Sequence, residues 1–461
     1  MNDLVIPIAA AVIDELRSDA IGANKDFAPL VWAELAGGLE RWLSRLLHSA
    51  LSTKLAIATT SAKPSAKIAV RRDIAACDLG IGRFFKFFPG AKETVDLVVK
   101  DWVTAQRLML ARLKQDRKRL AAMVPEIAHQ RIKRITPGLS DPHDCGQTVT
   151  IVQFANGGRV VYKPRDCEGE KIWFSALLWL NGNGFEPSSH IPTLIGRGRY
   201  CWMSFVDHRE CNSINAVERF YFRWGAQAAI AQLLGCADLH RQNWIASGED
   251  PVLVDGEMVG DAFSPHAGQV DRHLHPLLRT GLLPFFESDG VGRYEGIAPF
   301  DSSGRKKEQN VFWPVYHGRT QTPDKYIEEI ANGFEAAARF VCAPRNCKRF
   351  RPFILQAARR KHLRLLKRAT AQYRQILDES LHPYYLRKRG DRFKYLFERC
   401  GKDRIEADCL IRCSVPRFTT RLNAKASPSV PAFGTMLESA QLLRSRLAPQ
   451  SKGKRKTKRP Q

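Results

Sequence analysis

Hydrophobic positions recur with a helical period in the first part of this chain and with a strand pattern after about residue 137. Between residues 1 and 125 apolar side chains return every three or four positions, which is typical of helices with one buried face. One helix is predicted from Ala91 through Leu120, with the charged run Asp116–Arg119 on its outer face. Because this region holds no catalytic motif, we interpret 1–125 as a helical region for packing or peptide binding.

The segment from Pro137 onward has the pattern of strands and turns. Thr148–Phe154 is rich in β-branched residues, Asn156-Gly157-Gly158 is a hairpin turn, and Arg159–Lys163 is the expected return strand. The elements predicted next are a helix at 168–180 and a strand pair at 191–195 and 200–205. Together these elements predict a small β-rich lobe that covers residues 126–215.

Residues 216–425 have a mostly helical pattern. A buried helix from Val217 to Leu234 leads into a polar loop, which is followed by the short apolar strand Val252–Val254. Further helices are predicted at 324–341, 350–377 and 391–399. The last region, 426–461, loses aromatic residues after Phe433 and ends in a Lys/Arg tract, which predicts disorder. The expected fold class is therefore helix-rich α+β.

The bulk composition narrows the possible partners without selecting one. With 44% hydrophobic and 26% charged residues, the chain is globular rather than disordered as a whole. Its net charge is +25, and six of the basic residues lie in the last ten positions. Such a surplus supports solubility or affinity for polyanions: nucleic acid, an acidic peptide or a nucleotide. We do not expect a specific nucleic-acid partner.

The eleven cysteines are scattered along the chain. The closest pairs, Cys342 with Cys347 and Cys409 with Cys413, lack the spacing of a zinc knuckle, so no zinc is expected. The apolar run Ile6–Ile13 is too short to cross a bilayer and has no basic segment before it. We therefore expect reduced thiols, no membrane span and a cytoplasmic location.

Four short polar segments follow the order of a phosphoryl-transfer site. They are Asp141-Pro142-His143, Val161–Arg165, Asp238–Asn243 and Val254–Glu257. A lysine after an apolar strand, then an aspartate and an asparagine on a loop, then carboxylates after another apolar strand, is the set of groups that binds ATP and Mg²⁺ in kinases. Each segment alone has a simpler explanation, but their joint order favours an ATP and Mg²⁺ site.

The first two segments supply candidate phosphate-binding groups. Lys163 ends the return strand, where its ammonium can pair with nucleotide phosphates. An ordinary solvent-exposed lysine is the alternative. Because the adjoining segment has too few glycines for a Gly-rich loop, Asp141 and His143 would have to contribute through their side chains.

The last two segments supply candidate catalytic and metal-binding groups. Asp238 can orient a hydroxyl group or accept its proton, and His240 can serve as acid, base or hydrogen-bond donor. The amide oxygen of Asn243 suits Mg²⁺, which prefers oxygen ligands. Asp255 and Glu257, two positions apart on an extended chain, point to one side and can hold a metal. A capped turn and a solvated strand end are the alternatives.

Several stretches of this chain resemble the dehydratase domain of LanM-type (class II) lanthipeptide synthetases. The resemblance runs from about residue 90 to 425 and rests on 138–149, 160–165, 177–181, 218–257, 278–284, 364–386 and 406–421. It implies a bilobal lipid-kinase-like core with additional N-terminal and C-terminal helices. Such enzymes use ATP to phosphorylate Ser and Thr of a ribosomally made precursor peptide, then eliminate phosphate to give dehydroalanine and dehydrobutyrine in lantibiotic biosynthesis.

The resemblance also implies a role for each candidate residue. It assigns phosphate binding to Lys163, Asp141 and His143, catalysis to Asp238 and His240, and metal binding to Asn243 and Asp255 with Glu257 beside them. Arg364 and Thr370, six positions apart with Arg368 between them, match the elimination motif of the family. If this segment is helical, Arg364 and Arg368 share a face, and an ordinary basic amphipathic helix is the alternative.

Two departures from the family pattern bear on function. The chain reads Cys413-Ser414-Val415-Pro416 where the family often has Gly-Asp-Ile-Pro. No Cys/His zinc set follows Arg421, so thioether ring closure would need a separate cyclase partner. The expected function is a peptide dehydratase. A peptide or protein kinase without lyase activity, and a non-catalytic peptide-binding protein, are the alternatives.

Overall fold

The chain forms two compact units, each assembled from three segments. The computed structural model describes residues 2–19, 26–60, 81–259, 275–283, 285–286, 293–294, 311–359, 361–365, 367–421 and 433–447. Unit 1 contains Met1–Asp166, Thr193–Phe205 and Leu365–Phe418. Unit 2 contains Cys167–Pro192, Val206–Arg364 and Thr419–Gln461. The boundaries predicted from the sequence, 1–125, 126–215, 216–425 and 426–461, stay predictions.

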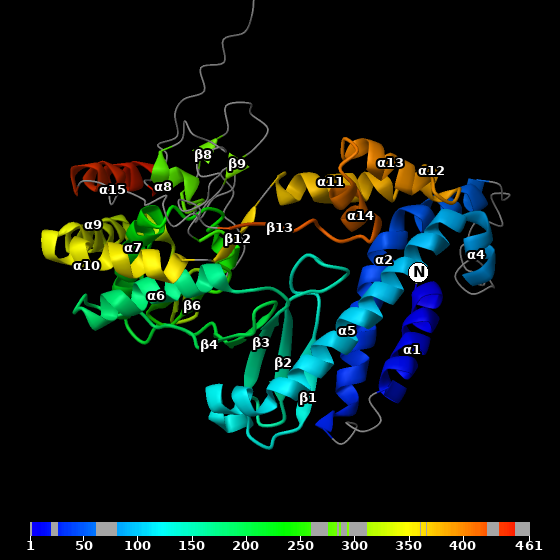
Figure 1. Cartoon of the computed structure of the whole chain (residues 1–461), viewed down its shortest axis with the longest axis horizontal. Coiled ribbons are helices and arrows are strands. Elements are labelled where there is room, and N and C mark those ends of the chain that lie inside the picture. The colour runs from blue at the N-terminus through cyan, green and yellow to red at the C-terminus, as the bar shows by residue number, and fades with distance from the viewer. Residues whose placement is uncertain are drawn as a thin grey trace, which may run out of the picture. The chain divides into compact units, whose positions relative to one another are not determined.

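The N-terminal part of unit 1 is helical, as its period predicts. Its helices are α1 (Asn2–Asp19), α2 (Pro29–Thr60), α4 (Ile81–Phe87) and α5 (Pro89–Met123) (Figure 1). Leu35, Leu39 and Leu43 of α2 are fully buried, and Val98 of α5 belongs to the same core. The predicted helix at 91–120 is therefore confirmed, with two or three more residues at each end.

A five-stranded antiparallel sheet completes this core. Its order is β1-β2-β3-β5-β4, with the bounds β1 (Ile132–Thr136), β2 (Thr150–Phe154), β3 (Arg159–Lys163), β4 (Leu194–Gly196) and β5 (Cys201–Ser204). Ile151 of β2 pairs with Val161 of β3 across the predicted turn, where Gly157 has φ +93°. A glycine suits that turn because it adopts positive φ without strain. The predicted hairpin and the second strand pair are confirmed.

Asp116 on α5 is fully buried, so its prediction on an outer face is wrong. Its Oδ2 accepts hydrogen bonds from the Tyr200 hydroxyl at 2.7 Å and from Trp202 Nε1 at 3.1 Å. Arg197 Nε lies 3.1 Å from Oδ1. These partners replace the water that a buried carboxylate loses, and they attach α5 to the sheet. The local sequence does not show that Asp116 differs in burial from the basic residues beside it, because the difference arises only from tertiary contacts.

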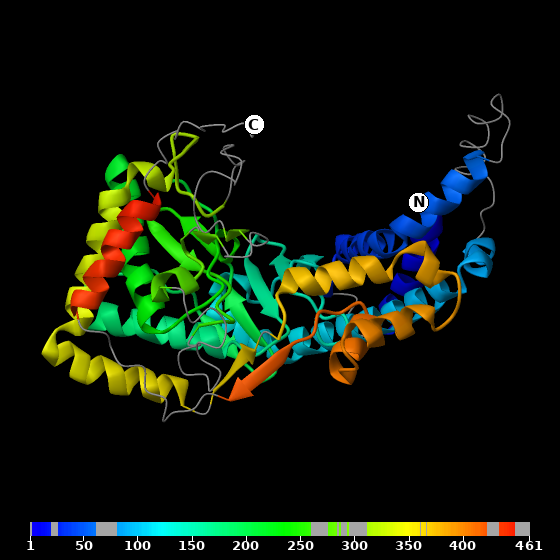
Figure 2. The same ribbon diagram turned by 90° about the horizontal axis from the view of Figure 1, so that it is seen from above.

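The remaining helices of unit 1 come from the third segment of the chain. They are α11 (Thr370–Ser380), α12 (Pro383–Leu386), α13 (Asp391–Arg399) and α14 (Arg404–Ile411). Buried residues of α11, α13 and α14, including Tyr373, Leu396 and Leu410, form a smaller cluster. Arg392 is 1% exposed and donates to the carbonyls of Leu410 and Ile411 at the end of α14. Figure 2 shows these helices in orange.

Unit 2 is built around the buried helix α7. Its helices are α6 (Glu168–Gly182), α7 (Ile214–Leu233), α8 (Pro276–Arg279), α9 (Ile327–Cys342), α10 (Pro344–Ala358) and α15 (Phe433–Leu447). A Cβ on Gly225 of α7 would lie 1.9 Å from the carbonyl oxygen of Ile330, and one on Gly333 of α9 would lie 1.9 Å from that of Phe222. These reciprocal glycines let the two helix backbones touch, so any larger residue would push α7 and α9 apart.

Short strands of unit 2 form two-residue to four-residue ladders. They are β6 (Trp244–Ser247) with β7 (Asp250–Leu253), β8 (Phe285–Phe286) with β9 (Arg293–Tyr294), and β10 (Val315–Tyr316) with β11 (Arg319–Thr320). The predicted apolar strand 252–254 thus corresponds to the end of β7. Strand β12 (His362–Leu365) pairs with β13 (Phe418–Arg421).

The prediction of one helix over 350–377 is wrong. The structure has α10, then β12, then α11, so Arg364 lies on a strand and Thr370 is the first residue of a helix. The segment His362–Leu365 alternates polar and apolar residues, which is the two-residue period of a strand rather than the period of a helix. This change of period was hard to recognise because basic residues flank His362–Leu365 on both sides. The predicted helix at 391–399 is confirmed as α13.

The predicted disorder of 426–461 is also wrong in part, because α15 lies inside it. Met436, Ala440 and Leu443 are fully buried at spacings of four and three residues, so they form one apolar helix face. Arg444 donates to Glu328 and Glu335 of α9. The basic tract after residue 447 lies outside the described residues.

The structure bears on two expectations from the sequence, reduced cysteines and the lack of a membrane-spanning helix. The described free cysteines are 145, 211, 236, 342, 347, 400, 409 and 413. Cys167 and Cys201 are each disulfide-bonded, so the expectation of reduced thiols fails at these two positions. Across the described ranges, no helix is both long and apolar enough to span a bilayer.

Candidate functional site

The loop that follows α7 is held by backbone hydrogen bonds and by the side chain of Asn243. Asn243 ends the short 3-10 helix Arg241–Asn243, and its Nδ2 donates to the carbonyl oxygen of Asp238 at 2.7 Å. The Asn243 N–H donates to the carbonyl of His240 at 2.9 Å, and Leu239 N–H donates to the carbonyl of Thr280 at 2.8 Å. Asp238 has φ +59°, a conformation that aspartate tolerates better than most residues. The loop is thus closed upon itself.

Asp238 and His240 lie side by side in this loop. Their side chains are 40% and 33% exposed, and His240 Nε2 lies 3.8 Å from Asp238 Oδ1. That separation is longer than a hydrogen bond, and it is short enough for each charge to affect the other. Both side chains therefore reach solvent next to each other, as groups that exchange protons with a substrate need to do.

Asn243 also joins this loop to the segment after β7. Its carbonyl oxygen accepts from the N–H of Val254 at 2.8 Å and from the N–H of Asp255 at 3.4 Å. Ala237 N–H donates to the carbonyl of Met258 at 3.1 Å, on the far side of the same junction. Two segments that the sequence separates are thereby brought together within unit 2. Asn243 and Asp255 meet as adjacent backbone partners.

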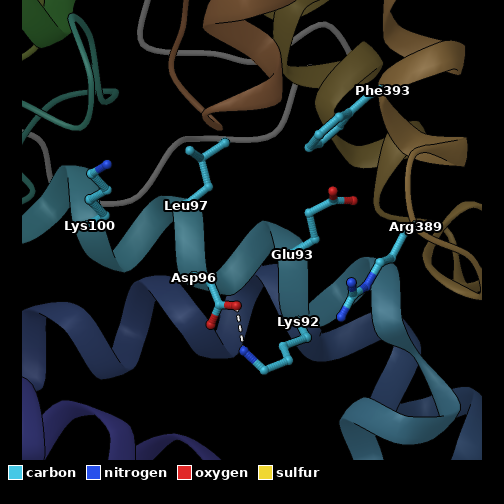
Figure 3. A pocket seen from close by; sticks show the side chains of 7 residues that line it. All are labelled: Lys92, Glu93, Asp96, Leu97, Lys100, Arg389 and Phe393. Carbon is cyan, nitrogen blue, oxygen red and sulfur yellow. Dashed lines mark hydrogen bonds and ion pairs between the residues drawn. The ribbon is translucent and has the colours of Figure 1, made fainter.

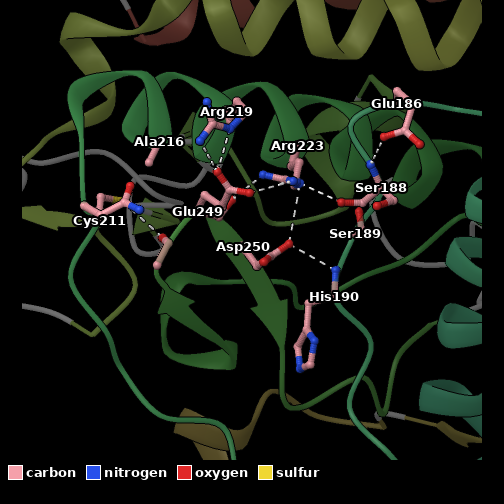
Figure 4. A network of polar contacts seen from close by, with 12 residues as sticks. Glu186, Ser188, Ser189, His190, Cys211, Ala216, Arg219, Arg223, Glu249 and Asp250 are labelled. Carbon is pink, nitrogen blue, oxygen red and sulfur yellow. Dashed lines mark hydrogen bonds and ion pairs between the residues drawn. The ribbon is translucent and has the colours of Figure 1, made fainter.

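The far end of the β6–β7 hairpin is fixed to α7 (Figure 4). Arg223 of α7, which is 6% exposed, donates from Nη1 to the carbonyl oxygen of Glu249 at 3.0 Å and from Nη2 to its carboxylate at 3.1 Å. Its Nε donates to the carbonyl of Ser188 at 2.7 Å. Asp250 accepts from the His190 N–H at 3.0 Å. The hairpin is anchored at its turn, which steadies the opposite ends that carry Asn243 and Val254.

The donor set at this junction fits a magnesium ion. Asn243 is an amide residue whose Nδ2 donates to the Asp238 carbonyl, and its backbone partner Asp255 is a carboxylate residue, so both donor types occur at this junction. Amide and carboxylate oxygens suit Mg²⁺, which keeps several waters or phosphate oxygens as further ligands. Within the described ranges, no group of three or more His, Cys, Asp or Glu side chains could hold a metal. A metal here would therefore depend on oxygen atoms from water or a phosphate ligand.

Glu257 follows in the turn after β7 and forms an ion pair with Arg364 of β12. Glu257 Oε2 lies 3.2 Å from Arg364 Nη1, and the two side chains are 12% and 10% exposed. Next to Glu257, the Gly256 N–H donates to Oε1 of the fully buried Glu170 at 3.4 Å. Two residues that the resemblance assigns to different half-reactions are thus direct partners in unit 2.

Lys163 lies in unit 1 at the end of β3, opposite Cys201 of β5. The residue is 3% exposed. A buried ammonium group requires anionic or polar partners, so the alternative of an ordinary solvent-exposed lysine is excluded. The preceding side chain, Tyr162, accepts a hydrogen bond from Arg112 on α5 at 2.5 Å. Burial raises the pKa of the Tyr162 hydroxyl.

Asp141 and His143 lie in a loop of unit 1 whose side chains bind other parts of that unit. Asp141 accepts three hydrogen bonds from Arg374 of α11, at 2.9 to 3.2 Å. His143 Nδ1 lies 2.8 Å from the carbonyl oxygen of Val415, and the Val415 N–H donates to the carbonyl of Pro142 at 2.7 Å. The loop that the sequence assigns to phosphate binding is therefore attached to the segment that departs from the family pattern.

Several residues that form hydrogen bonds with the candidate segments were not identified from the sequence. Ser414, noted only as a departure, accepts from the buried Gly146 N–H at 3.0 Å. Glu406 of α14 is 2% exposed, accepts from Arg368 Nε at 3.1 Å and accepts from the Tyr373 hydroxyl at 2.6 Å. Burial, together with that hydrogen bond, raises the pKa of Tyr373. No local pattern marks these partners, because each acts on a residue far away in the sequence.

Described cavities in unit 1 lie away from these motifs. One, of about 470 Å³, is bordered by α5 and by the segment around α13 (Figure 3), and it is lined by Lys92, Glu93, Asp96, Leu97, Lys100, Arg389 and Phe393. Another, of about 750 Å³, is lined by residues of α1, α5 and β1. Neither contains a residue that the sequence assigns to catalysis.

The predicted residues divide between the two units. Unit 1 holds Lys163, Asp141, His143 and Thr370, and unit 2 holds Asp238, His240, Asn243, Asp255, Glu257 and Arg364. Within unit 2 the catalytic-loop and strand-end residues meet through Asn243, and Glu257 meets Arg364. Their chemical roles stay predictions.

Comparison with known proteins places this chain in a family. The chain belongs to the family described as Domain of unknown function (DUF4135), whose model matches residues 88–312 and 299–421. It is also similar to the lacticin 481/lactococcin biosynthesis protein LcnDR2 of Lactococcus lactis subsp. lactis. The two sequences are 22% identical over 58% of this chain and 34% of the relative, so the chain spans about a third of that relative's length.

Proposed function

We propose that this protein is a lanthipeptide-type dehydratase. It phosphorylates Ser and Thr side chains of a ribosomally made precursor peptide with ATP and Mg²⁺, then eliminates phosphate to leave dehydroalanine or dehydrobutyrine. The proposal includes a bilobal lipid-kinase-like core, a cytoplasmic location and a separate cyclase partner for any ring closure. The similarity to a lacticin 481/lactococcin biosynthesis protein supports the biosynthetic class.

The junction at Asn243 is the observation that carries this proposal. Its carbonyl receives the N–H groups of Val254 and Asp255, and its side chain binds the carbonyl of Asp238. One residue therefore links the backbone of the proposed proton acceptor, Asp238, to the backbone of the proposed metal ligand, Asp255. Phosphoryl transfer depends mainly on positioning and on charge stabilisation, so this arrangement suits that reaction.

In the first half-reaction a substrate hydroxyl attacks the γ-phosphorus of ATP. The new bond joins the serine or threonine oxygen to phosphorus, the bond between phosphorus and the ADP oxygen breaks, and Asp238 accepts the hydroxyl proton. His240, beside Asp238, donates a hydrogen bond to the transferring group. Lys163 pairs with nucleotide phosphates, and Asp141 and His143 order the phosphate loop. Asn243 and Asp255, with Glu257 beside them, would hold Mg²⁺, which would supply neutralisation of the phosphate charge.

In the second half-reaction phosphate leaves the modified side chain. A protein base removes the α-proton, its electron pair forms the carbon–carbon double bond, and the bond between carbon and the phosphate oxygen breaks. Arg364 binds the departing phosphate, whose charge a guanidinium can hold with two hydrogen bonds. Thr370 is assigned to this step through the same motif, at the start of α11.

Mass spectrometry of the precursor peptide tests the proposal. Incubation with ATP, Mg²⁺ and the peptide encoded beside this protein should remove one water mass for each modified Ser or Thr. Asp238→Asn should leave the peptide unmodified. An intact peptide after incubation with the folded wild-type protein would reject both half-reactions.

A kinase without lyase activity is the second candidate, and one observation favours it. Arg364 is on a strand and is paired with Glu257, rather than on a helix face with Arg368 as expected. A guanidinium held by a carboxylate has less charge to offer a departing phosphate. Arg364→Ala and Thr370→Ala discriminate, because only in a bifunctional enzyme should they change the product from dehydrated peptide to phosphopeptide. If the wild-type protein itself stops at phosphopeptide, the kinase-only function is correct.

A further inference from the structure

The ion pair between Glu257 and Arg364 joins two nearly buried side chains of unit 2. Glu257 Oε2 and Arg364 Nη1 are 3.2 Å apart, and each side chain keeps about a tenth of its surface in contact with solvent. A carboxylate that is this far removed from water needs a counter-charge. Arg364 is one such counter-charge.

Both partners sit on anchored backbone. The turn that carries Glu257 is fixed by the hydrogen bond from Ala237 to Met258 and by the bond from Gly256 to the buried Glu170. Arg364 belongs to β12, which is paired with β13. The contact therefore does not follow from two flexible surface side chains that meet by chance.

Arg364 keeps one buried donor without an acceptor. Its Nε is buried and has no hydrogen-bond partner in the part of the chain that the structure describes. A buried polar atom of this kind requires an explanation, and an anionic ligand absent from the structure is one. The guanidinium thus uses Nη1 on Glu257 and retains Nε for another anion.

A second carboxylate in unit 2, that of Glu168, is also paired with basic side chains. Glu168, at the start of α6, pairs with Lys171 at 2.6 Å and with Lys361, which lies three residues before Arg364. Lys361 therefore carries the same charge as Arg364, in the same segment, but on a different carboxylate. This makes Lys361 the matched control for any effect of charge alone.

We propose that Arg364 and a divalent cation compete for the Glu257 carboxylate. Arg364 neutralises Glu257 in the metal-free protein, and metal binding weakens this pair and releases the guanidinium for an oxyanion. The inference rests on the proposed function, since it assumes a metal beside Asp255 and Glu257. It would couple metal loading, which phosphoryl transfer needs, to the arginine that phosphate elimination needs.

Competition and a purely structural role predict opposite changes in metal affinity when Arg364 is removed. Two cations that share one carboxylate oppose each other, and the opposition is reciprocal. Removing the guanidinium should therefore tighten metal binding. If Arg364 only kept Glu257 in place, its removal would instead weaken metal binding, because the carboxylate would lose its orientation.

Calorimetric titration of the whole 461-residue chain with Mn²⁺ alone, as a probe for Mg²⁺, measures whether the affinity rises or falls. Arg364→Gln should bind Mn²⁺ about fivefold or more tightly than wild type. Lys361→Gln should change the affinity by less than about twofold, because the charge of Lys361 is paired with Glu168. Circular dichroism should show the wild-type helix content for both variants.

Glu257→Gln closes a double-mutant cycle. Without the Glu257 charge there is nothing to compete for, so adding Arg364→Gln to Glu257→Gln should leave Mn²⁺ affinity unchanged. An equal or weaker Mn²⁺ affinity in folded Arg364→Gln would overturn the inference. So would an Arg364→Gln effect that persists in the Glu257→Gln background.

A measurement on the wild-type protein avoids any folding defect of the variants. Phenylglyoxal labels accessible guanidinium groups, and peptide mapping locates the label. Mn²⁺ should raise labelling of Arg364 at least about twofold, and it should leave labelling of Arg374, which pairs with Asp141, unchanged. Unchanged labelling of Arg364 at saturating Mn²⁺ would reject the competition.

The inference and the proposed function fail in different ways. Wild-type protein that binds no Mn²⁺, with or without ATP, and transfers no phosphate would reject the proposed function and the inference with it. Wild-type protein that binds Mn²⁺ and phosphorylates peptide, but in which Arg364→Gln does not tighten the metal, would reject only the inference.

Discussion

Two loops of this protein carry the same Asp-x-His sequence, and they are held in opposite ways. In unit 1 the side chains of Asp141 and His143 bind Arg374 and the Val415 carbonyl. In unit 2 the loop of Asp238 and His240 is closed by backbone groups and by the Asn243 amide. The first loop uses its polar side chains to hold its shape. In the second loop, the side chains of Asp238 and His240 stay partly exposed, at 40% and 33%.

The comparison shows why a motif alone does not assign a role. Because a carbonyl oxygen only accepts, the Nδ1 of His143 must carry a proton to bond with Val415. That ring is therefore committed to one orientation. Asp238 and His240 lie 3.8 Å apart and keep more than 30% of their surface exposed, which is compatible with the proton transfer that we propose for unit 2.

The largest expected effect comes from Asp238→Asn. Loss of the proton acceptor should slow peptide phosphorylation about 10²- to 10⁴-fold. The melting temperature should stay near that of wild type, because the substitution keeps the Asp238 carbonyl, which accepts from Asn243 Nδ2. Phosphopeptide formation is followed by mass spectrometry. Asp141→Asn is the matched comparison and should slow phosphorylation less, because Asp141 is proposed only to order the phosphate loop; an equal loss there would break the distinction between the two loops.

Asn243→Ala should have the next largest effect. The variant removes the amide that binds the Asp238 carbonyl, so Asp238 should move by enough to cost about 10²-fold in phosphorylation rate. Gln242, exposed in the same loop, is the control, and Gln242→Ala should keep nearly the full rate. Wild-type activity of Asn243→Ala would show that the backbone bonds alone hold the loop.

Ser414→Ala tests the support of the unit 1 loop. Its hydroxyl, 1% exposed, accepts from the buried Gly146 N–H, which would be left without a partner. The free energy of unfolding should fall by about 1–3 kcal/mol in urea denaturation. Thr104→Ala, which removes an exposed hydroxyl on α5, should change it by less than about 0.5 kcal/mol. Equal effects would mean that Ser414 does not hold the loop.

Arg374→Gln should have the smallest effect. Arg374 makes a bidentate contact with Asp141, but its side chain is 63% exposed. The pair should therefore contribute less than about 1 kcal/mol to the free energy of unfolding. Urea denaturation at low and high salt measures this contribution, which should shrink as salt screens the charges. A larger loss that does not depend on salt would indicate that Asp141 is fixed by this one arginine.

Local sequence patterns were enough to predict the elements whose hydrogen bonds join residues close together in the sequence. The hairpin of β2 and β3 needed only β-branched strands and the turn at Gly157, and α6, α7 and α13 needed only their apolar period. The same reasoning failed over 350–377, where basic residues concealed the two-residue alternation of β12. It failed again for α15, whose apolar face is short.

The sequence by itself therefore determined the main helices, the β2–β3 hairpin and the candidate chemical groups. Only the tertiary structure decided that Lys163 and Asp116 are buried, that Asn243 meets Asp255, and that Glu257 meets Arg364. The physical reason is range. A turn or a helix forms from bonds between residues a few positions apart, whereas the Glu257–Arg364 pair spans 107 positions and the Asp141–Arg374 pair spans 233. Burial and charge pairing over such separations depend on the fold of the chain around them.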